Sequence, residues 1–245
     1  GGFCCVDEGS DKEGQFVILE YKAAQKNAPT VALIGKGVTF DTGGISLKPS
    51  NAMSGMKYDM SGAAAVFGVM EAVAQLKPQV NVVGITPLVE NMPSGKSSRQ
   101  DDIVTFMNGK SAEIESTDAE GRLILADALC YAEEYYKPDY MIDIATLTGA
   151  CVVALGHVFT GMMTRDDELS SMLFTAGNKT GDRIWPLPLD DDYQEAIRSD
   201  IADLINCGKR GYGAGTITAG LFLENFVSKA RWAHLDIAGT GHDVL

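Results

Sequence analysis

The sequence predicts an α/β protein with a largely parallel central sheet. Short β-branched apolar runs alternate along the chain with alanine-rich or leucine-rich runs of helical length. Such alternation is typical of helices layered on a parallel sheet. The 245 residues, 45% of them hydrophobic, are enough to bury a sizeable core. Because no repeat, low-complexity segment or linker divides the chain, we treat residues 1–245 as one domain.

In the first part of the chain, two strands lead to a glycine-rich loop and a helix. Residues 16–21 and 30–34 are short β-rich runs separated by a polar turn. Residues 35–44 are rich in glycine, which permits positive φ and close backbone approach, so we expect a loop at the end of a strand there. The alanine-rich run at residues 60–76 predicts a mostly buried helix.

Three further apolar runs predict buried strands, at residues 80–89, 140–145 and 232–237. Pro87 lacks the N–H that a ladder needs, so we expect it to end the first of these strands. The run at residues 123–131 predicts a helix. Residues 141–159 are apolar but contain Asp143 and several glycines, so we expect a buried strand and a loop there, and no membrane span. Residues 206–216 are a candidate mobile loop, although an ordinary surface connection fits equally well.

Composition narrows the partners and the compartment. The chain has 33 acidic and 20 basic residues and a net charge of −13, which argues against nucleic acid and anionic membranes as partners. Its five cysteines have no regular spacing, so we expect reduced thiols and a cytoplasmic location. The first residues contain no basic segment followed by an apolar one, so a secretory signal is not expected, and the chain is predicted to be soluble.

The most informative stretch is residues 116–123, Ser-Thr-Asp-Ala-Glu-Gly-Arg-Leu. If residues 114–120 are extended, Asp118 and Glu120 project from the same face of the strand. The helix that follows presents free N–H groups beside Arg122, where an anion can bind. A solvated acidic turn that caps a helix would have the same pattern, so the stretch has to be read together with residues upstream.

Two more carboxylates precede this stretch. Asp41 lies in the glycine-rich loop at the end of a strand, and Asp59 lies at the start of the predicted helix 60–76. Open α/β sheets collect functional groups at the carboxyl ends of their strands, so these two can meet Asp118 and Glu120 there. Four unpaired carboxylates would repel one another and take up protons, whereas divalent metals neutralise them. The spacing therefore predicts a metal site.

Lysines complicate this acidic site. Lys36 and Lys48 flank Asp41, and a lysine among carboxylates is usually an ion-pair partner. Lys36 is alternatively a neutral amine ligand, if a dication at bonding distance lowers its pKa by about 3 to 4 units. The histidines lack the close spacing of zinc sites, and His234 is expected to be a satisfied core residue. Residues 95–97 lack the preceding glycine that a phosphate-binding P-loop needs.

Three blocks of this sequence resemble the leucine aminopeptidase, or cytosol aminopeptidase, family: residues 35–48, 91–95 and 117–123. The third block is the most specific, and the likeness extends over essentially the whole chain. The resemblance implies a zinc-peptidase-like three-layer sandwich, with a mixed, largely parallel sheet flanked by helices. It also implies a catalytic domain, with the N-terminal domain and the C-terminal end of the family absent from this chain.

The resemblance implies a site for two divalent metals. Asp41 and Glu120 would bridge the metals. Asp118 would complete one site, and Lys36 with Asp59 would complete the other. Ligands that are mostly oxygen, with one amine, do not decide between zinc and manganese, or exclude cobalt and magnesium.

Catalysis is assigned by the resemblance to two cationic residues. Lys48, kept charged, would stabilise the oxyanion that develops on the peptide carbonyl. Arg122 would hold a bicarbonate ion that accepts the proton of the attacking, metal-activated water.

Substrate contacts implied by the resemblance come from Lys48, Met56, Asp59, Ser116, Thr146, Leu147 and Gly149. Asp59 would bind the free α-amine, and Met56 would line an apolar pocket for a leucine-like side chain. Ser116 stands where the family usually has asparagine, which leaves one hydrogen bond of the site unassigned.

The function implied is that of an exopeptidase that removes a leucine-like N-terminal residue from peptides, assembled as a homohexamer. Two alternatives stay open. A dimetal phosphoesterase would act on phosphate esters without needing a free α-amine. A non-catalytic hexameric scaffold would be expected to have lost metal ligands, whereas all of those named above are present.

Overall fold

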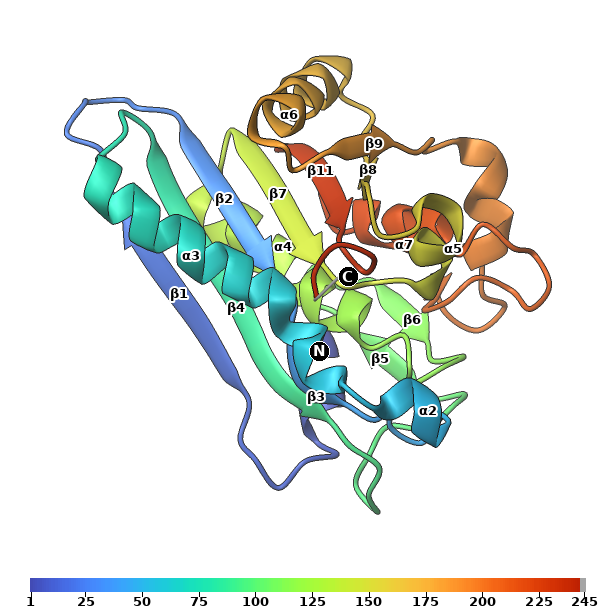
Figure 1. Cartoon of the computed structure of the whole chain (residues 1–245). Coiled ribbons are helices and arrows are strands. Elements are labelled where there is room, and N and C mark those ends of the chain that lie inside the picture. Colours follow the sequence, from blue (N-terminus) through green and yellow to red (C-terminus); the bar gives the residue numbers. More distant parts are fainter. Residues whose placement is uncertain (243–245) are drawn as a thin grey trace.

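The computed structural model describes residues 1–242. Its main sheet consists of β1 (Gln15–Tyr21), β2 (Thr30–Gly35), β3 (Gly37–Asp41), β4 (Asn81–Asn91), β7 (Tyr140–Ala145), β8 (Thr160–Met163), β9 (Ile184–Pro186) and β11 (Arg231–Asp236). The strand order is β1-β4-β2-β7-β11-β8-β9, with β3 beside β4 (Figure 1). Within this sheet, as far as residues 1–242 show it, only β1 with β4 and β8 with β11 pair antiparallel. The predicted mixed, largely parallel sheet is confirmed.

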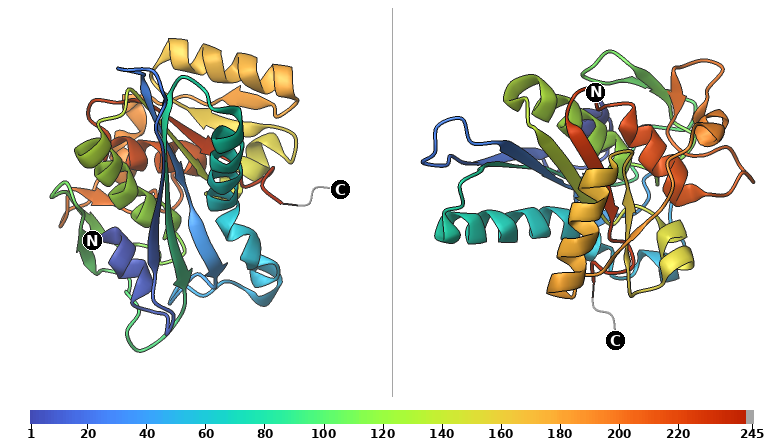
Figure 2. Two further views of the ribbon diagram at one scale, coloured as in Figure 1. Left: turned by 90° about the vertical axis from the view of Figure 1, so that its left-hand side faces the viewer. Right: turned by 90° about the horizontal axis from the view of Figure 1, so that it is seen from above.

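Helices cover both faces of this sheet. They are α1 (Gly2–Asp7), α2 (Ser50–Met53), α3 (Ser61–Leu76), α4 (Gly121–Tyr136), α5 (Gly149–Leu155), α6 (Asp167–Thr180) and α7 (Gly215–Glu224), with the 3₁₀ helices η1 (Met56–Met60) and η2 (Asp191–Ile197). α3 lies against one face, and α4 with α1 against the other, which gives three layers (Figure 2). None of the helices in residues 1–242 is long and apolar enough to cross a membrane.

A small second sheet lies beside the α4 layer, and its strand β6 precedes α4 in the sequence. It contains β5 (Ile103–Thr105), β6 (Ser111–Glu113) and β10 (Leu204–Ile205), in the order β10-β6-β5. The segment between β6 and α4 carries Asp118 and Glu120. It ends close to the carboxyl ends of β2 and β3, because α4 packs on the main sheet.

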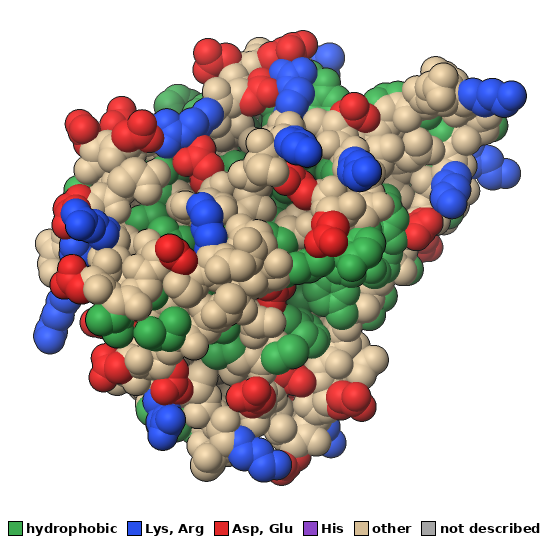
Figure 3. All heavy atoms as spheres, turned by 180° about the vertical axis from the view of Figure 1, so that it is seen from behind, with side chains coloured by type: hydrophobic (Ala, Val, Ile, Leu, Met, Phe, Trp, Pro, Cys, Tyr) green, Lys and Arg blue, Asp and Glu red, His purple; other side chains and the backbone are tan. Residues whose placement is uncertain are grey.

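The core lies mainly between the main sheet and α4. Every residue from 121 to 130 in α4 is buried, including the charged Arg122 and Asp127, so this part of the helix has no solvent-facing polar stripe. Seen from behind in Figure 3, acidic and basic side chains surround a band of apolar ones. Acidic and basic side chains are intermixed on this face.

Two expectations about the strands were wrong. Residues 37–41, expected as loop, form β3, which pairs with β4 beyond the end of β2. β4 also continues past Pro87 to Asn91. Pro87 falls between Ile85, the last partner of β2, and Leu88, the first partner of β3. A proline is tolerated there because the ladder on that side is already interrupted.

Two expectations about helices also need correction. Residues 141–159 contain α5 after β7, and not only a strand and a loop. Thr148 starts this helix, because its Oγ1 accepts a hydrogen bond from the N–H of Cys151 at 3.1 Å. α3 exists as predicted but is not mostly buried, with Val69 at 40% and Leu76 at 80% exposure. Its buried residues are Gly62, Ala63, Val66 and Met70.

Candidate metal centre

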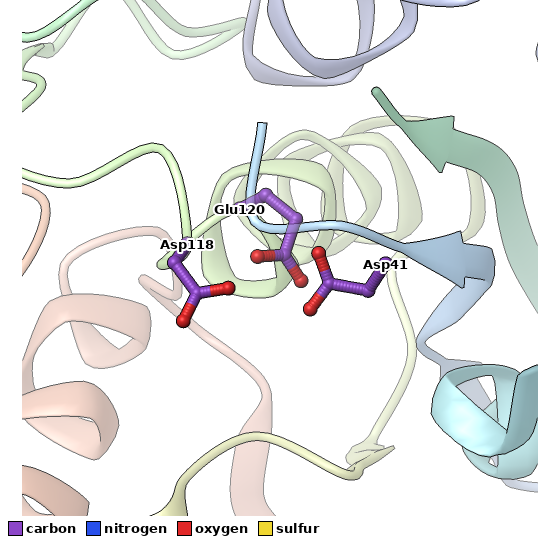
Figure 4. A group of neighbouring side chains, drawn as sticks. All are labelled: Asp41, Asp118 and Glu120. Atoms are coloured by element: carbon purple, nitrogen blue, oxygen red, sulfur yellow. The ribbon is translucent and has the colours of Figure 1, made fainter. Parts of the chain in front are cut away.

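Three carboxylates meet at the end of β3 and the start of α4. Asp41 ends β3, and Asp118 and Glu120 come from the segment before α4; one oxygen of each lies within 4.8 Å of the others. Asp41 and Glu120 are each 2% exposed, whereas Asp118 is exposed. In Figure 4 the carboxylates of Asp41 and Glu120 point towards each other, with that of Asp118 beside them. The predicted convergence of these three residues is present.

The convergence of Asp118 and Glu120 does not come from an extended strand, as expected. The chain turns at residues 117–118, and Glu120 has helical angles, with φ −73° and ψ −35°. Ser116 closes the turn: its Oγ accepts a hydrogen bond from the N–H of Asp118 at 3.2 Å. Such hydroxyl bonds to the backbone two residues on compete with strand formation. An asparagine side chain can make the same bond, so serine preserves the turn here.

Asp59 joins the group through Lys36. Lys36 lies between β2 and β3 and is 3% exposed, and Asp59, in η1, is also 3% exposed. Lys36 Nζ is 2.9 Å from Asp59 Oδ2 and 2.9 Å from Glu120 Oε1. It donates a hydrogen bond to the carbonyl oxygen of Thr146 at 3.0 Å. The side chain passes over Gly121, where a Cβ atom would lie 2.5 Å from Lys36 Cε.

Lys48 occupies the opposite, more open side of the group. Its Nζ is 2.8 Å from Asp41 Oδ2 and 2.5 Å from Asp118 Oδ1, and its side chain is 14% exposed. Four carboxylates therefore surround two ammonium groups, which leaves a formal excess of two negative charges. A buried excess of this kind favours the binding of cations.

The pKa values reflect this crowding. Burial raises the pKa of Glu120 to about 8; the charge of Asp41 adds to this effect and that of Lys36 opposes it. Burial also raises the pKa of Asp59 to about 6, again against the charge of Lys36. Burial alone would lower the pKa of Lys36, but the surrounding carboxylates outweigh it and raise that pKa. In this arrangement Lys36 is an ammonium ion, and its amine form requires a dication at bonding distance.

The donors present fit divalent metals. Glu120 Oε2 is buried and has neither a hydrogen-bond nor an ion-pair partner among residues 1–242. Asp59 Oδ2 and Glu120 Oε1 each form an ion pair with Lys36 Nζ. The angles of these contacts are not those of a hydrogen bond, and neither oxygen has another partner among the described residues. Unsatisfied buried oxygens are costly, and a bound cation removes that cost. Carboxylate oxygens suit hard and borderline dications.

Two residues that lie in the blocks 91–95 and 117–123, but to which the sequence assigned no role, hold the carboxylates in place. Asn91, at the end of β4, donates from Nδ2 to Asp41 Oδ1 at 2.9 Å and to the carbonyl oxygen of Thr117 at 3.0 Å. Thr117 Oγ1 donates to the carbonyl oxygen of Gly43 at 2.6 Å and accepts from the N–H of Ser46 at 2.8 Å. A polar residue that ends an apolar strand was the available signal for Asn91.

Arg122 is buried with unsatisfied donors. It is 6% exposed, and its Nε and Nη1 have no hydrogen-bond partner in the described part of the chain. Burial lowers its pKa. The first turn of α4, which contains Arg122, has no side-chain cap. Arg122 also lines a cavity of about 280 Å³ together with residues of the 206–216 connection. Free guanidinium and backbone N–H groups fit a small anion.

The residues expected to contact substrate differ in how directly they contact the carboxylate group. Thr146 is joined to the centre, because its Oγ1 donates to Asp59 Oδ1 at 2.7 Å. Leu147 follows it, and Gly149 is the first residue of α5. Met56 lies in η1, three residues before Asp59. A hydrogen bond joins Thr146 to the Asp59 carboxylate, and Ser116 is joined to the backbone N–H of Asp118, whereas no hydrogen bond within residues 1–242 connects Met56 or Gly149 with the carboxylates.

His234 is a core residue, but it is only half satisfied. It is 0% exposed, and its Nδ1 lies 2.5 Å from Asp143 Oδ1. Its Nε2 has no partner in the described residues.

The 206–216 connection is anchored where it begins, since Asn206 Nδ2 donates to the carbonyl oxygen of Ser116 at 2.7 Å. Asn206 thereby supports the turn that carries Asp118.

Comparison with known proteins gives a consistent result. The profile described as "Cytosol aminopeptidase family, catalytic domain" matches residues 1–244. Over 240 residues, the chain is 56% identical to the "Probable cytosol aminopeptidase" of Methylibium petroleiphilum, covering 98% of this chain and 49% of that protein. Identities are 53% with the protein of the same name from Chlorobium limicola, covering 98% and 47%, and 55% with that from Nitrosospira multiformis, covering 98% and 46%. The chain thus spans about half the length of the curated relatives it matches.

Proposed function

The chain belongs to the cytosol aminopeptidase family, and from this premise we propose that it removes N-terminal residues from peptides. The observation that carries the proposal is the buried group of carboxylates with an orphaned oxygen on Glu120. Two divalent metals bound there would supply an activated water and would polarise the peptide carbonyl. We propose zinc or manganese, with cobalt and magnesium as further candidates, because these donors do not discriminate among them.

We assign the metal ligands as follows. Asp41 and Glu120, which point towards each other, would be shared by the two metals. Asp118 would complete the more exposed position. Lys36, as a neutral amine, and Asp59 would complete the buried one. The separate ion pairs of Lys36 with Asp59 and of Lys48 with Asp118 support this division into two positions.

Two cationic side chains serve the reaction directly. Lys48 is the less buried lysine, and its Nζ stabilises the negative charge that develops on the carbonyl oxygen. The free Nε and Nη1 of Arg122, with the first N–H groups of α4, would hold a bicarbonate ion, which would supply a general base. Arg122 would orient this ion and hold the negative charge of the ion close to Glu120.

Substrate recognition follows from the same group. Asp59 accepts the free α-amine, which would restrict the enzyme to the first residue of a peptide. The backbone of Thr146, Leu147 and Gly149 contacts the peptide, and Met56 lines a pocket for a leucine-like side chain. Ser116 keeps the turn of Asp118 closed. We further propose a cytoplasmic homohexamer with no membrane or nucleic-acid partner.

A panel of three substrates tests this function. We expect the protein loaded with zinc or manganese to hydrolyse leucine p-nitroanilide and to leave its N-acetylated analogue and p-nitrophenyl phosphate intact. Cleavage of the phosphate ester would contradict the proposal and favour a dimetal phosphoesterase. Inactivity on all three, with metals bound, would also contradict it and favour a non-catalytic scaffold.

A further inference from the structure

We propose that Asp236 positions the loop 146–148 and, through it, one of the two metal positions. Asp236 ends β11 and is 0% exposed. None of the ion pairs formed within residues 1–242 includes it. A buried carboxylate without a cationic partner is costly unless hydrogen bonds to its charged form compensate, so its partners indicate what it does. The proposal rests on the two-metal function proposed above.

Most hydrogen bonds to the Asp236 carboxylate come from one loop. Its Oδ1 accepts from the N–H of Leu147 at 3.3 Å, from that of Thr148 at 3.5 Å and from that of Ala238 at 3.1 Å. Its Oδ2 accepts from the hydroxyl of Thr148 at 2.7 Å. The same hydroxyl is 2.9 Å from that of Thr216, in the first turn of α7. Asp236 therefore ties the loop to the ends of β11 and α7.

The other side of the loop contacts the metal centre. Thr146 Oγ1 donates to Asp59 Oδ1 at 2.7 Å, and the Thr146 carbonyl oxygen accepts from Lys36 Nζ at 3.0 Å. Lys36 and Asp59 are the two residues proposed to complete the buried metal position. No hydrogen bond among the described residues joins the loop to the three remaining carboxylates. Asp236 thus acts most directly on the buried metal position, and reaches the other only through Glu120, the ion-pair partner of Lys36.

The negative charge of Asp236 is suited to this task. Three N–H groups meet Oδ1, and a hydroxyl donor meets Oδ2. In an Asp236→Asn variant the amide oxygen would serve the N–H groups, and the NH₂ group would face the hydroxyl of Thr148. That hydroxyl can accept this bond beside the one from the N–H of Cys151, and its own hydrogen would then turn to Thr216 Oγ1. The loop would keep its hydrogen bonds to residue 236 but lose their charge assistance, while the volume of the side chain stays almost the same.

The test is a manganese titration of Asp236→Asn beside the wild type, followed by calorimetry. Residues that orient metal ligands typically change metal affinity by about 10- to 100-fold when mutated. We expect such a loss for the ion in the buried position and a clearly smaller change for the other. We also expect amide hydrogen exchange at Leu147 and Thr148 to accelerate in the metal-free variant. Exchange does not depend on the metals or on activity.

Asp143→Asn is the matched control. Asp143 is also 0% exposed and lies on β7, beside β11, but its partners are Trp232 Nε1 at 2.7 Å and His234 Nδ1 at 2.5 Å. Its substitution should lower stability without separating the two metal affinities. If Asp236→Asn does not fold, the pair Thr148→Val and Thr148→Ser tests the same anchor. Valine removes the hydroxyl and should reproduce the effect, and serine should rescue it.

Metal affinities that are unchanged in Asp236→Asn would overturn the proposal. It would also be overturned if Asp143→Asn separated the two metal affinities to the same extent as Asp236→Asn. Unchanged exchange at Leu147 and Thr148 would overturn it as well. A wild type that binds fewer than two ions would contradict the proposed function instead, and the exchange data would still decide whether Asp236 positions the loop.

Discussion

Glu120 is a carboxylate at a buried position, where an unpaired charge costs free energy. It is 2% exposed, and its Oε2 has no partner in the described residues. Burial and Asp41 together raise its pKa to about 8. A protein that evolved only for stability would gain by replacing this group with an apolar side chain. Its presence beside Asp41, Asp59 and Asp118 is therefore best explained by a bound cation.

This raised pKa predicts how the stability of the metal-free protein depends on pH. The folded-state pKa of Glu120, about 8, lies above its ordinary value of 4.5, so between these values the folded protein binds more protons than the unfolded chain. Its contribution to stability is complete below about pH 4.5 and is lost as the pH rises through about 8. With a chelator present, the wild type should lose stability in urea relative to Glu120→Gln as the pH rises. A difference that stays constant across this range would contradict the assignment.

Arg122 allows metal binding and catalysis to be separated. Arg122→Ala should keep both metals, because its guanidinium contacts none of the carboxylates within ion-pair distance. Its turnover should fall by about 10²- to 10⁴-fold, the usual value of a general acid or base. Metal analysis beside kcat checks this, with Glu120→Ala, which should lose the metals, as the control. Equal metal loss in both variants would contradict this division of roles.

At the scale of elements, the turn before α4 illustrates what a sequence can and cannot predict. The spacing of Asp118 and Glu120, and the helix after them, indicated correctly that two carboxylates converge. The reason was wrong, because a hydrogen bond between Ser116 and Asp118 bends the chain where alternation predicted a strand. Period-2 spacing and a tight turn both bring residues i and i+2 together, and only the backbone hydrogen bonds distinguish them.

Supporting contacts from distant elements could not be predicted. Asn91 and Asp236 lie about 50 and 90 residues from the groups they hold, Asp41 and the loop 146–148. Their roles depend on the order in which β3, β4, β7 and β11 lie in the sheet. Local pattern carries no information on that order. By contrast, strands β2, β7 and β11 were recognisable because buried parallel strands are continuous apolar runs.

Gly121 tests the packing at the start of α4. A Cβ atom there would lie 2.5 Å from Lys36 Cε and 2.7 Å from Lys36 Nζ, so Gly121→Ala must displace Lys36. We expect a loss of about 1–3 kcal/mol in the free energy of unfolding and weaker metal binding. Gly68→Ala, in α3, is the control, because a Cβ atom there meets nothing within 4 Å and alanine favours helix. If both variants bind metal like the wild type, Gly121 is not required by Lys36.

At the scale of the whole molecule, the sheet explains why the site is where it is. Lys36 follows β2, Asp41 ends β3 and Thr146 follows β7. Glu120 is the N-cap of α4, and all four residues lie at one end of the sheet. Parallel strands place their carboxyl ends together, and ligand sites of α/β proteins form there. The convergence of Asp41, Asp118 and Glu120 was therefore predictable, and the three-layer fold was implied by the family resemblance. The exposure of α3, the helix α5 and strand β3 were not, because they depend on how the layers pack.

The central claim is that Asp41 and Glu120 bridge two metals. Electron paramagnetic resonance of the manganese-loaded protein tests it most directly, because ions that share bridging ligands lie about 3.5–4 Å apart and their spins couple. We predict the spectrum of a coupled pair in the wild type, and its loss in Glu120→Ala. Six-line spectra of isolated ions in the wild type, at any loading, would contradict a bridged two-metal centre.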